Sequence, residues 1–184
     1  MTKPFELLRE IVIVPFDASW ADEYRTIASA LSGVFGDELF ATHHVGSTAI
    51  AGMRAKPIID VLIEVRDIER VDGFDDRMIA LGYEPRGEFG IAGRRFFVKY
   101  ENGVRKQHVH TFQRGHEAVG SHLDFRDYLM AHPDVAGAYA RLKDALAEEF
   151  RDDIVGYSDG KAGFIADVIE RAREERASVT RWES

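Results

Sequence analysis

One stretch of the sequence, residues 44–65, constrains the fold of this chain more than any other. It combines a strand end, a tight turn of small residues, a short basic link and a strongly apolar strand. At the turn, Gly46 lets the backbone approach a ligand and adopt φ angles that other residues avoid. The hydroxyl and backbone N–H groups of Ser47 and Thr48 suit a phosphate. The alternative is a plain turn in which Ser47 or Thr48 caps a helix.

Asp60 lies inside the apolar strand that follows this turn. The run of β-branched and aliphatic residues is interrupted only by Asp60 and Glu64. Because strand side chains alternate between faces, Asp60, Leu62 and Glu64 point to one side. A carboxylate in such a run is costly unless it is paired, binds a metal or lies at an open strand end. Asp60 is therefore the candidate catalytic residue, and an ion pair with Arg54 or Lys56 is the alternative.

Composition restricts the class of protein. The 184 residues suit one substantial domain, which is expected to span 1–184. A composition with 45% hydrophobic and 30% charged residues is ordinary for a globular protein. The formal charge of −8 argues against binding of bulk nucleic acid. The absence of cysteine excludes disulfides and thiolate metal sites.

The same composition gives an expectation for location. No apolar run approaches the roughly 20 residues of a membrane span. The first residues, Met1–Glu6, lack the apolar core of a signal peptide. A cytoplasmic protein without a membrane partner is expected.

Apolar periodicity and turn signals predict the order of the elements. Strands are expected at 11–14, 39–45 and 58–65, and helices at 19–35, 68–81, 117–131, 133–150 and 158–178. The dipeptide Asn102-Gly103 predicts a hairpin that pairs residues 94–100 with 104–112. Asp17 and Ser158 are expected helix caps. This order predicts an α/β to α+β fold, with a mixed, largely antiparallel sheet, flanking helices and a helical C-terminal part over about 115–184.

The string His44-Val-Gly-Ser-Thr…Gly52…Ala55-Lys56-Pro57-Ile58-Ile59-Asp60 closely resembles the GrpB family. That family also occurs as the C-terminal extension of some dephospho-CoA kinases. The resemblance implies a nucleotidyltransferase-like fold, in which the Gly-Ser turn holds a triphosphate and strand carboxylates hold Mg²⁺. It implies no defined biochemical role, and any kinase partner would act in trans.

The sequence departs from the nucleotidyltransferase pattern at Leu62. Those enzymes carry two acids on one strand face, whereas Glu64 lies roughly 13 Å from Asp60 along a strand. His108 and His110 share a face two residues apart and, with Asp60, would form a two-histidine, one-carboxylate set. Such a set suits Mn, Fe or Zn better than Mg. The expected cofactor is a divalent metal, Mg or Mn for a transferase, and the alternative is a polar pair in a solvated hairpin.

Basic residues supply the remaining phosphate candidates. Lys56 precedes the Asp60 strand, and Lys161 is expected near a helix N-terminus, where a lysine opposes the helix dipole. Arg94 and Arg95 face opposite sides of their strand, so only one of them can reach a given site. Which one does so is left open, and Arg95 is the candidate.

Three functions are compatible with these residues. The first is an enzyme that binds a nucleoside triphosphate and transfers a nucleotidyl group to a small-molecule acceptor. The second is a non-catalytic nucleotide-binding or folding-accessory module. The third is a metal-dependent phosphoester hydrolase. All three share a small phosphate-containing ligand.

Overall fold

The computed structural model describes residues 11–182, built around a five-stranded sheet in the order β1-β2-β5-β4-β3. The strands are β1 (Leu39–Val45), β2 (Ile59–Val65), β3 (Tyr83–Pro85), β4 (Arg94–Glu101) and β5 (Val104–Gln113). Only the β2–β5 pair is parallel, and the three other pairs are antiparallel. The mixed, largely antiparallel sheet predicted from the sequence is confirmed.

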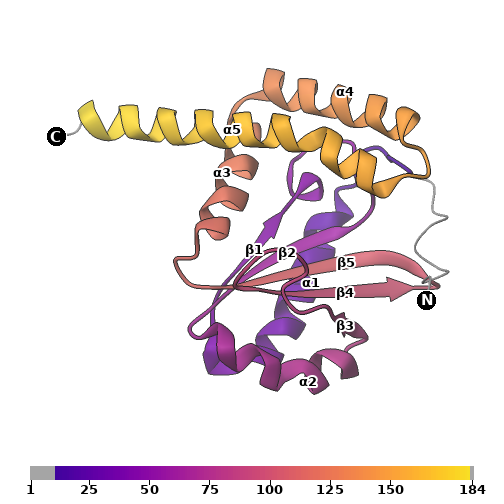
Figure 1. Cartoon of the computed structure of the whole chain (residues 1–184), viewed down its shortest axis with the longest axis vertical. Helices are drawn as coiled ribbons and strands as arrows, with labels where there is room; N and C mark the ends of the chain where they lie inside the picture. Colours follow the sequence, from indigo (N-terminus) through magenta and orange to yellow (C-terminus); the bar gives the residue numbers. More distant parts are fainter. Residues whose placement is uncertain (1–10, 183–184) are drawn as a thin grey trace.

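Helices cover both faces of this sheet (Figure 1). One face carries α1 (Ser19–Phe35), the 3₁₀ segment η3 (Ile68–Phe74) and α2 (Asp75–Ala80), and the other carries α3 (Glu117–Ala131). The C-terminal α4 (Pro133–Glu149) and α5 (Ile154–Trp182) pack with α3 in a helical layer. Short 3₁₀ segments η1 (Gly36–Glu38) and η2 (Ser47–Ala49) flank β1.

Alternation along β2 divides the apolar core between these layers. Val61, Ile63 and Val65 are fully buried against α1 and its neighbours. Leu62 is also fully buried, but on the α3 side of the sheet. Asp60 belongs to this second face by the period of two, so the sheet directs its carboxylate toward the C-terminal helices.

Local sequence signals explain several elements. Helix α1 and strand β1 have the predicted bounds, and the Asp17 carboxylate accepts a hydrogen bond from the Ser19 N–H at 2.8 Å. The turn residues Asn102 and Gly103 have φ of 50° and 72°, as a two-residue hairpin turn requires.

Three predicted elements differ in the structure. Residues 11–14 form no strand, and Val14 makes an isolated bridge to Ala55. The helix predicted at 68–81 is split into η3 and α2, because Gly73 weakens its middle. Helix α5 begins at Ile154, not at Ser158, since Asp153 Oδ1 accepts the N–H groups of Val155 and Gly156, each at 3.0 Å.

Among the described residues, no helix combines the length and the apolarity that crossing a membrane would need. The cytoplasmic location and the single-domain boundary 1–184 stay predictions.

Candidate functional site

The strand register brings Asp60, His108 and His110 together. In the parallel β2–β5 pair, Asp60 is opposite His108, and His110 lies two residues further along the same face. His108 Nδ1 lies 3.0 Å and His110 Nε2 3.5 Å from Asp60 Oδ1. Their ligand atoms all lie within 4.8 Å of one another. We call these three residues the Asp-His-His set.

Hydrogen bonding keeps the Asp60 carboxyl ionised. Burial opposes ionisation, but the hydrogen bonds from His108 and His110 outweigh it and hold the pKa of Asp60 well below its usual range. Burial lowers the pKa of His110, so its imidazole is neutral at pH 7. The set thus offers one carboxylate and a neutral imidazole on one face of the sheet.

The spacing of these atoms fits a divalent metal. Two ligand atoms each about 2.1 Å from one ion lie roughly 3.0–3.5 Å apart, which is the separation found around Asp60. His108 Nε2 is buried with no hydrogen-bond partner among the described residues. Arg94 contacts His110 Nδ1 at 3.4 Å, which places the His110 proton on Nε2. Binding a metal through Nε2 would therefore require that proton to move to Nδ1, in place of the Arg94 contact.

Gly46 brings the turn against this set. Its φ of 73° and ψ of −175° form a conformation that only glycine adopts readily. A Cβ at this position would lie 2.5 Å from Asp60 Oδ2. The glycine thus places the backbone of the Gly46–Thr48 turn in direct contact with the carboxylate.

Hydrogen bonds of the Thr48 side chain hold the turn in position. The Thr48 hydroxyl donates to the Ile58 carbonyl at 3.4 Å and accepts from His44 Nε2 at 3.0 Å. The His44 ring stacks on Tyr24 at 4.8 Å, and burial lowers the His44 pKa to about 4. The Thr48 hydroxyl is therefore occupied inside the protein. The role of Thr48 as a phosphate ligand stays a prediction.

Ser47 meets a buried lysine that the sequence analysis missed. Lys143 on α4 is 2% exposed, and its ammonium group donates to Ser47 Oγ at 3.0 Å and to the Arg54 carbonyl. Burial, and then the charge of Lys161, lowers the Lys143 pKa to about 8. The sequence pattern that could have indicated the burial of Lys143 is its position on the apolar stripe of α4, four residues after Tyr139 and three before Leu146.

Two predicted lysines extend the positive charge. The ammonium groups of Lys161 and Lys56 lie 4.3 Å and 5.1 Å from the ring centroid of buried Tyr157. Burial, and then the charge of Lys56, lowers the Lys161 pKa to about 8, while Asp60 acts in the opposite direction. Burial also lowers the pKa of Lys56. We call Lys56, Lys143 and Lys161 the lysine cluster.

The position of Lys161 differs from the expectation. Because α5 begins at Ile154, Lys161 lies two turns into the helix, where the dipole effect has faded. Its proximity to Lys56 and Asp60 supports it as a candidate, whereas the argument from the dipole was wrong.

The lysine cluster predicts a rise in stability at alkaline pH. Unfolded lysines keep their protons up to about pH 10.4, whereas native Lys143 and Lys161 release theirs near pH 8. Between these values the unfolded state binds more protons, so the free energy of unfolding increases with pH, by at most about 1.4 kcal/mol per pH unit for each lysine. Urea unfolding of wild type and Lys161→Met between pH 7.5 and 9.5 measures this. The variant should show the smaller slope, and equal slopes would contradict the assignment.

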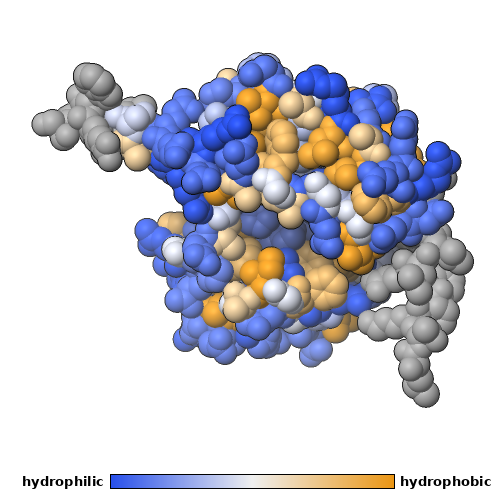
Figure 2. Space-filling view, turned by 45° about the horizontal axis from the view of Figure 1, so that its top comes forward, coloured by the Kyte–Doolittle hydropathy of each residue, from blue (hydrophilic) through white to orange (hydrophobic). Residues whose placement is uncertain are grey.

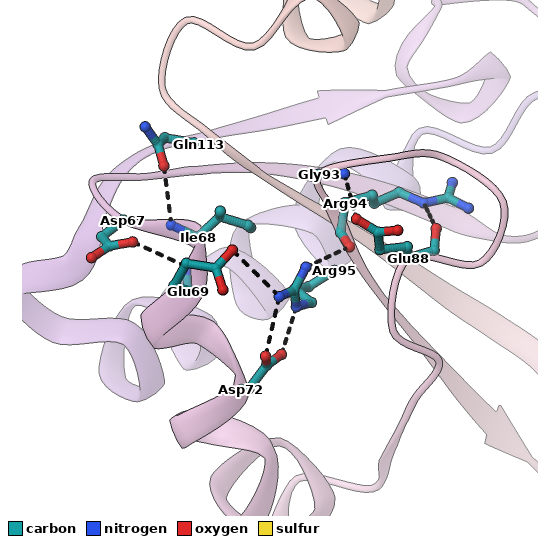
Figure 3. Close-up of polar contacts among 9 residues, drawn as sticks. All are labelled: Asp67, Ile68, Glu69, Asp72, Glu88, Gly93, Arg94, Arg95 and Gln113. Atoms are coloured by element: carbon teal, nitrogen blue, oxygen red, sulfur yellow. Dashed lines mark hydrogen bonds and ion pairs between the residues drawn. The ribbon is translucent and has the colours of Figure 1, made fainter.

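Arg95 is paired with acidic residues of η3 (Figure 3) and not with the site. Its guanidinium bonds Asp72 at 2.6 and 3.1 Å and lies 3.9 Å from Glu69, on the α1 and η3 side of the sheet. A plain two-residue hairpin would have put Arg95 opposite His110, but the register shifts between Lys99 and Tyr100. This irregularity exchanges the faces of β4. The candidate role of Arg95 as a phosphate ligand is therefore corrected.

Arg94, and not Arg95, lies on the same face of the sheet as the Asp-His-His set. It is 6% exposed, and it donates to the carbonyls of Glu88 and Phe89 at 3.1 and 2.6 Å as well as contacting His110. Its guanidinium also lies 4.7 Å from the Phe96 ring centroid. Arg94 thus connects the loop before β4 to one member of the Asp-His-His set.

The neighbouring charged residues have structural partners. Glu64 bonds His43 at 2.8 Å, and Arg54 pairs with Asp144 at 3.4 Å instead of with Asp60. Arg126 on α3 bonds Asp127 and donates to the His44 carbonyl at 3.0 Å.

His122 on α3 is a second residue that the sequence did not single out. Its ring lies 5.2 Å from that of His110, and burial lowers its pKa to about 4. It therefore adds no positive charge beside the set at pH 7.

The site opens to solvent. Asp60 and His108 keep 26% and 17% of their side chains exposed. Figure 2 shows a hollow with a hydrophilic floor between the helical layer and the part of the molecule below it. The sheet, the turn and the helices α4 and α5 together bring an ionised carboxylate, imidazoles and lysines close to one another, with Asp60 and His108 partly exposed and Lys143 buried.

Comparison with known structures defines the class of fold. The structure of terminal uridylyl transferase 4 from Trypanosoma brucei, with bound dUTP, superposes with a TM-score of 0.56 at 10% identity, over 89% of this chain and 56% of that chain. At this identity the likeness concerns the fold alone, which is nucleotidyltransferase-like. The fold class expected from the sequence is confirmed.

The chain belongs to the GrpB protein family, whose model matches residues 10–171. The crystal structure of GrpB from Enterococcus faecalis superposes with a TM-score of 0.85 at 34% identity, over 90% of this chain and 99% of that one. The UPF0157 protein YqkA of Bacillus subtilis is 48% identical over 90% of this chain, which spans 48% of that protein. A dephospho-CoA kinase of Mycobacterium bovis is 27% identical over 92% of this chain and 47% of the kinase.

Proposed function

We propose that this protein is a metal-dependent nucleotidyltransferase that acts on a small-molecule hydroxyl. The observation that carries the proposal is the contact between two chemically different groups of residues. The Gly46 turn joins the Asp-His-His set to Ser47 and, through it, to the lysine cluster. A divalent ion on the first group and a polyphosphate on the second would lie side by side.

The lysine cluster favours a polyanion over a single neutral ligand. Lys56 and Lys161 each lower the pKa of a neighbouring lysine, so the three charges repel one another in the ligand-free protein. An anion between them would relieve that repulsion and restore the lysine pKa values upward. Ser47, which already accepts from Lys143, would turn its hydroxyl proton toward the same anion.

The Asp-His-His set would hold the ion, with Asp60 as its one carboxylate. When bound, a divalent ion neutralises charge that develops on the phosphoryl oxygens. The acceptor hydroxyl oxygen forms a bond to the α-phosphorus, the bond to the β-phosphate oxygen breaks, pyrophosphate leaves and the hydroxyl proton passes to solvent. The protein contributes position and charge, which is most of what phosphoryl chemistry requires.

The donor set also supports a second function. Two imidazoles and one carboxylate suit Mn, Fe or Zn, and such a site can activate a water molecule to hydrolyse a phosphoester. Hydrolysis would use the same residues with water in place of the acceptor. The non-catalytic module, with or without a kinase partner in trans, would keep the phosphate-binding residues and form no product.

Product analysis separates these functions. Each common nucleoside triphosphate, labelled at the α-phosphate, is incubated with Mg²⁺ or Mn²⁺ and a panel of sugar, polyol and amino-alcohol acceptors. The proposal predicts pyrophosphate release with the label on an acceptor, and the loss of both without metal. Release of inorganic phosphate without a labelled acceptor would instead support the hydrolase. Ligand binding with no product under any condition would contradict both enzymes and support the module.

A further inference from the structure

The loop that joins β3 to β4, residues 86–93, carries an exposed phenylalanine in an unusual conformation. Phe89 is 56% exposed, and its φ of 43° lies in the left-handed region that bulky residues rarely adopt. The protein thus bears backbone strain in order to present an aromatic ring to water. Strained residues of this kind cluster at functional sites.

Phe89 is the outer end of a row of rings that leads to the Asp-His-His set. Its ring stacks on Phe96 with centroids 5.4 Å apart and planes at 26°. The Phe96 ring in turn lies 5.3 Å from His108 and 5.0 Å from His110. Phe96 is 5% exposed, so the row passes from a buried ring at the set to an open ring at the surface.

Arg94 holds the loop in this position. Its guanidinium donates to the carbonyls of Glu88 and Phe89 while contacting His110 and the Phe96 ring (Figure 3 draws the bond to Glu88). The Glu88 carboxylate also accepts the Gly93 N–H at 2.7 Å, which closes the loop on itself. The open face of Phe89 is therefore fixed before any ligand arrives, which lowers the entropic cost of binding against it.

The order of these groups across the sheet matches one class of ligand. The turn after β1 contacts Lys143 of the lysine cluster through Ser47, whereas Phe96 lies on β4, on the other side of β2 and β5 in the sheet, and Phe89 stacks on Phe96. A nucleoside triphosphate has the same order, with anionic phosphates at one end and a planar base at the other. Base–aromatic stacking tolerates every base, because each base has a π-face.

We infer that Phe89 is the stacking platform for the base of the donor nucleotide. This inference rests on the proposed function, because it takes the triphosphate to lie on the lysine cluster. It names a substrate class, a nucleoside polyphosphate in preference to an inorganic polyphosphate. It also assigns Arg94 as the residue that positions the platform.

The test compares ligands with and without a base. Calorimetric titration in the presence of Mn²⁺ measures the affinity of wild type and Phe89→Ala for ATP, UTP and inorganic tripolyphosphate. Loss of one stacked base is expected to weaken ATP and UTP binding roughly 5- to 100-fold. The affinity for tripolyphosphate should be unchanged.

Two further variants sharpen the result. Phe89→Trp keeps an aromatic face and should retain nucleotide affinity, with tryptophan fluorescence quenched by ATP and not by tripolyphosphate. Phe40→Ala removes another exposed phenylalanine, 41% exposed on the edge strand β1, and should leave all three affinities unchanged.

The outcomes distinguish this inference from the function on which it rests. If wild type binds tripolyphosphate and nucleotides equally, and Phe89→Ala changes neither, the platform is refuted while the phosphate site stands. If Phe89→Ala weakens tripolyphosphate as much as ATP, the loop has only a structural role and the inference fails. If wild type binds none of the three, the proposed function and the inference are both overturned.

Discussion

Replacement of Asp60 by asparagine is expected to abolish turnover. The substitution keeps the shape of the side chain but removes the only carboxylate of the Asp-His-His set, whose negative charge His108 and His110 stabilise. A metal ion supplies several kcal/mol of transition-state stabilisation, so its loss lowers kcat by roughly 1000-fold or more. The rate of pyrophosphate release from a triphosphate with saturating acceptor measures this effect.

The matched control for this prediction is Asp72→Asn. Asp72 is also a carboxylate with a close ion-pair partner, Arg95 at 2.6 Å, but it lies on the opposite side of the sheet. This variant should keep wild-type turnover even if it loses some stability. Equal losses in the two variants would show that Asp60 acts through folding and not through the site.

Replacement of Gly46 by alanine is expected to disrupt the site and destabilise the fold. The left-handed φ of 73° costs about 1–3 kcal/mol for a residue with a Cβ, and the new methyl group would lie 2.5 Å from Asp60 Oδ2. Relief of that clash requires the turn or Asp60 to move, at a further cost of about 1–3 kcal/mol. Denaturant unfolding and turnover should therefore decrease together.

The control variant Gly52→Ala separates the cost of the left-handed backbone from the cost of the clash with Asp60. Gly52 has a φ of 76°, but a Cβ there would meet nothing within 4 Å. It should show the strain cost alone and keep the site intact. If Gly46→Ala lowers stability and turnover no more than Gly52→Ala does, the contact between the turn and Asp60 contributes nothing to function.

The fold was predictable where short-range signals determine it. The spacing of apolar residues in α1 and the Asn102-Gly103 turn act over a few residues, and the structure has both as expected. The helix expected at 68–81 failed because one glycine in its middle outweighed the flanking apolar pattern. The start of α5 was misplaced because Asp153, not Ser158, satisfies the first N–H groups.

The site was predictable only as far as strand alternation reaches. The period of two places His108 and His110 on one face of β5, and the set with Asp60 that the sequence predicted forms through the parallel register of β5 with β2. The apolar stripe of α4 predicts that Lys143 is buried, but its contact with Ser47 depends on how α4 packs over the turn, which no local pattern encodes. The choice between Arg94 and Arg95 depends on a one-residue irregularity in the hairpin, which no turn signal in the sequence reveals.

Binding of Mn²⁺ to the Asp-His-His set is the central claim, and electron paramagnetic resonance tests it most directly. Titration of Mn²⁺ into wild type, Asp60→Asn, His110→Ala and the control Asp72→Asn reports the free ion at each step. The account predicts one tight site per chain in wild type and Asp72→Asn, tighter with tripolyphosphate present, and its loss in Asp60→Asn and His110→Ala. A wild type that binds no Mn²⁺, or an Asp60→Asn variant that binds it equally well, would contradict the account.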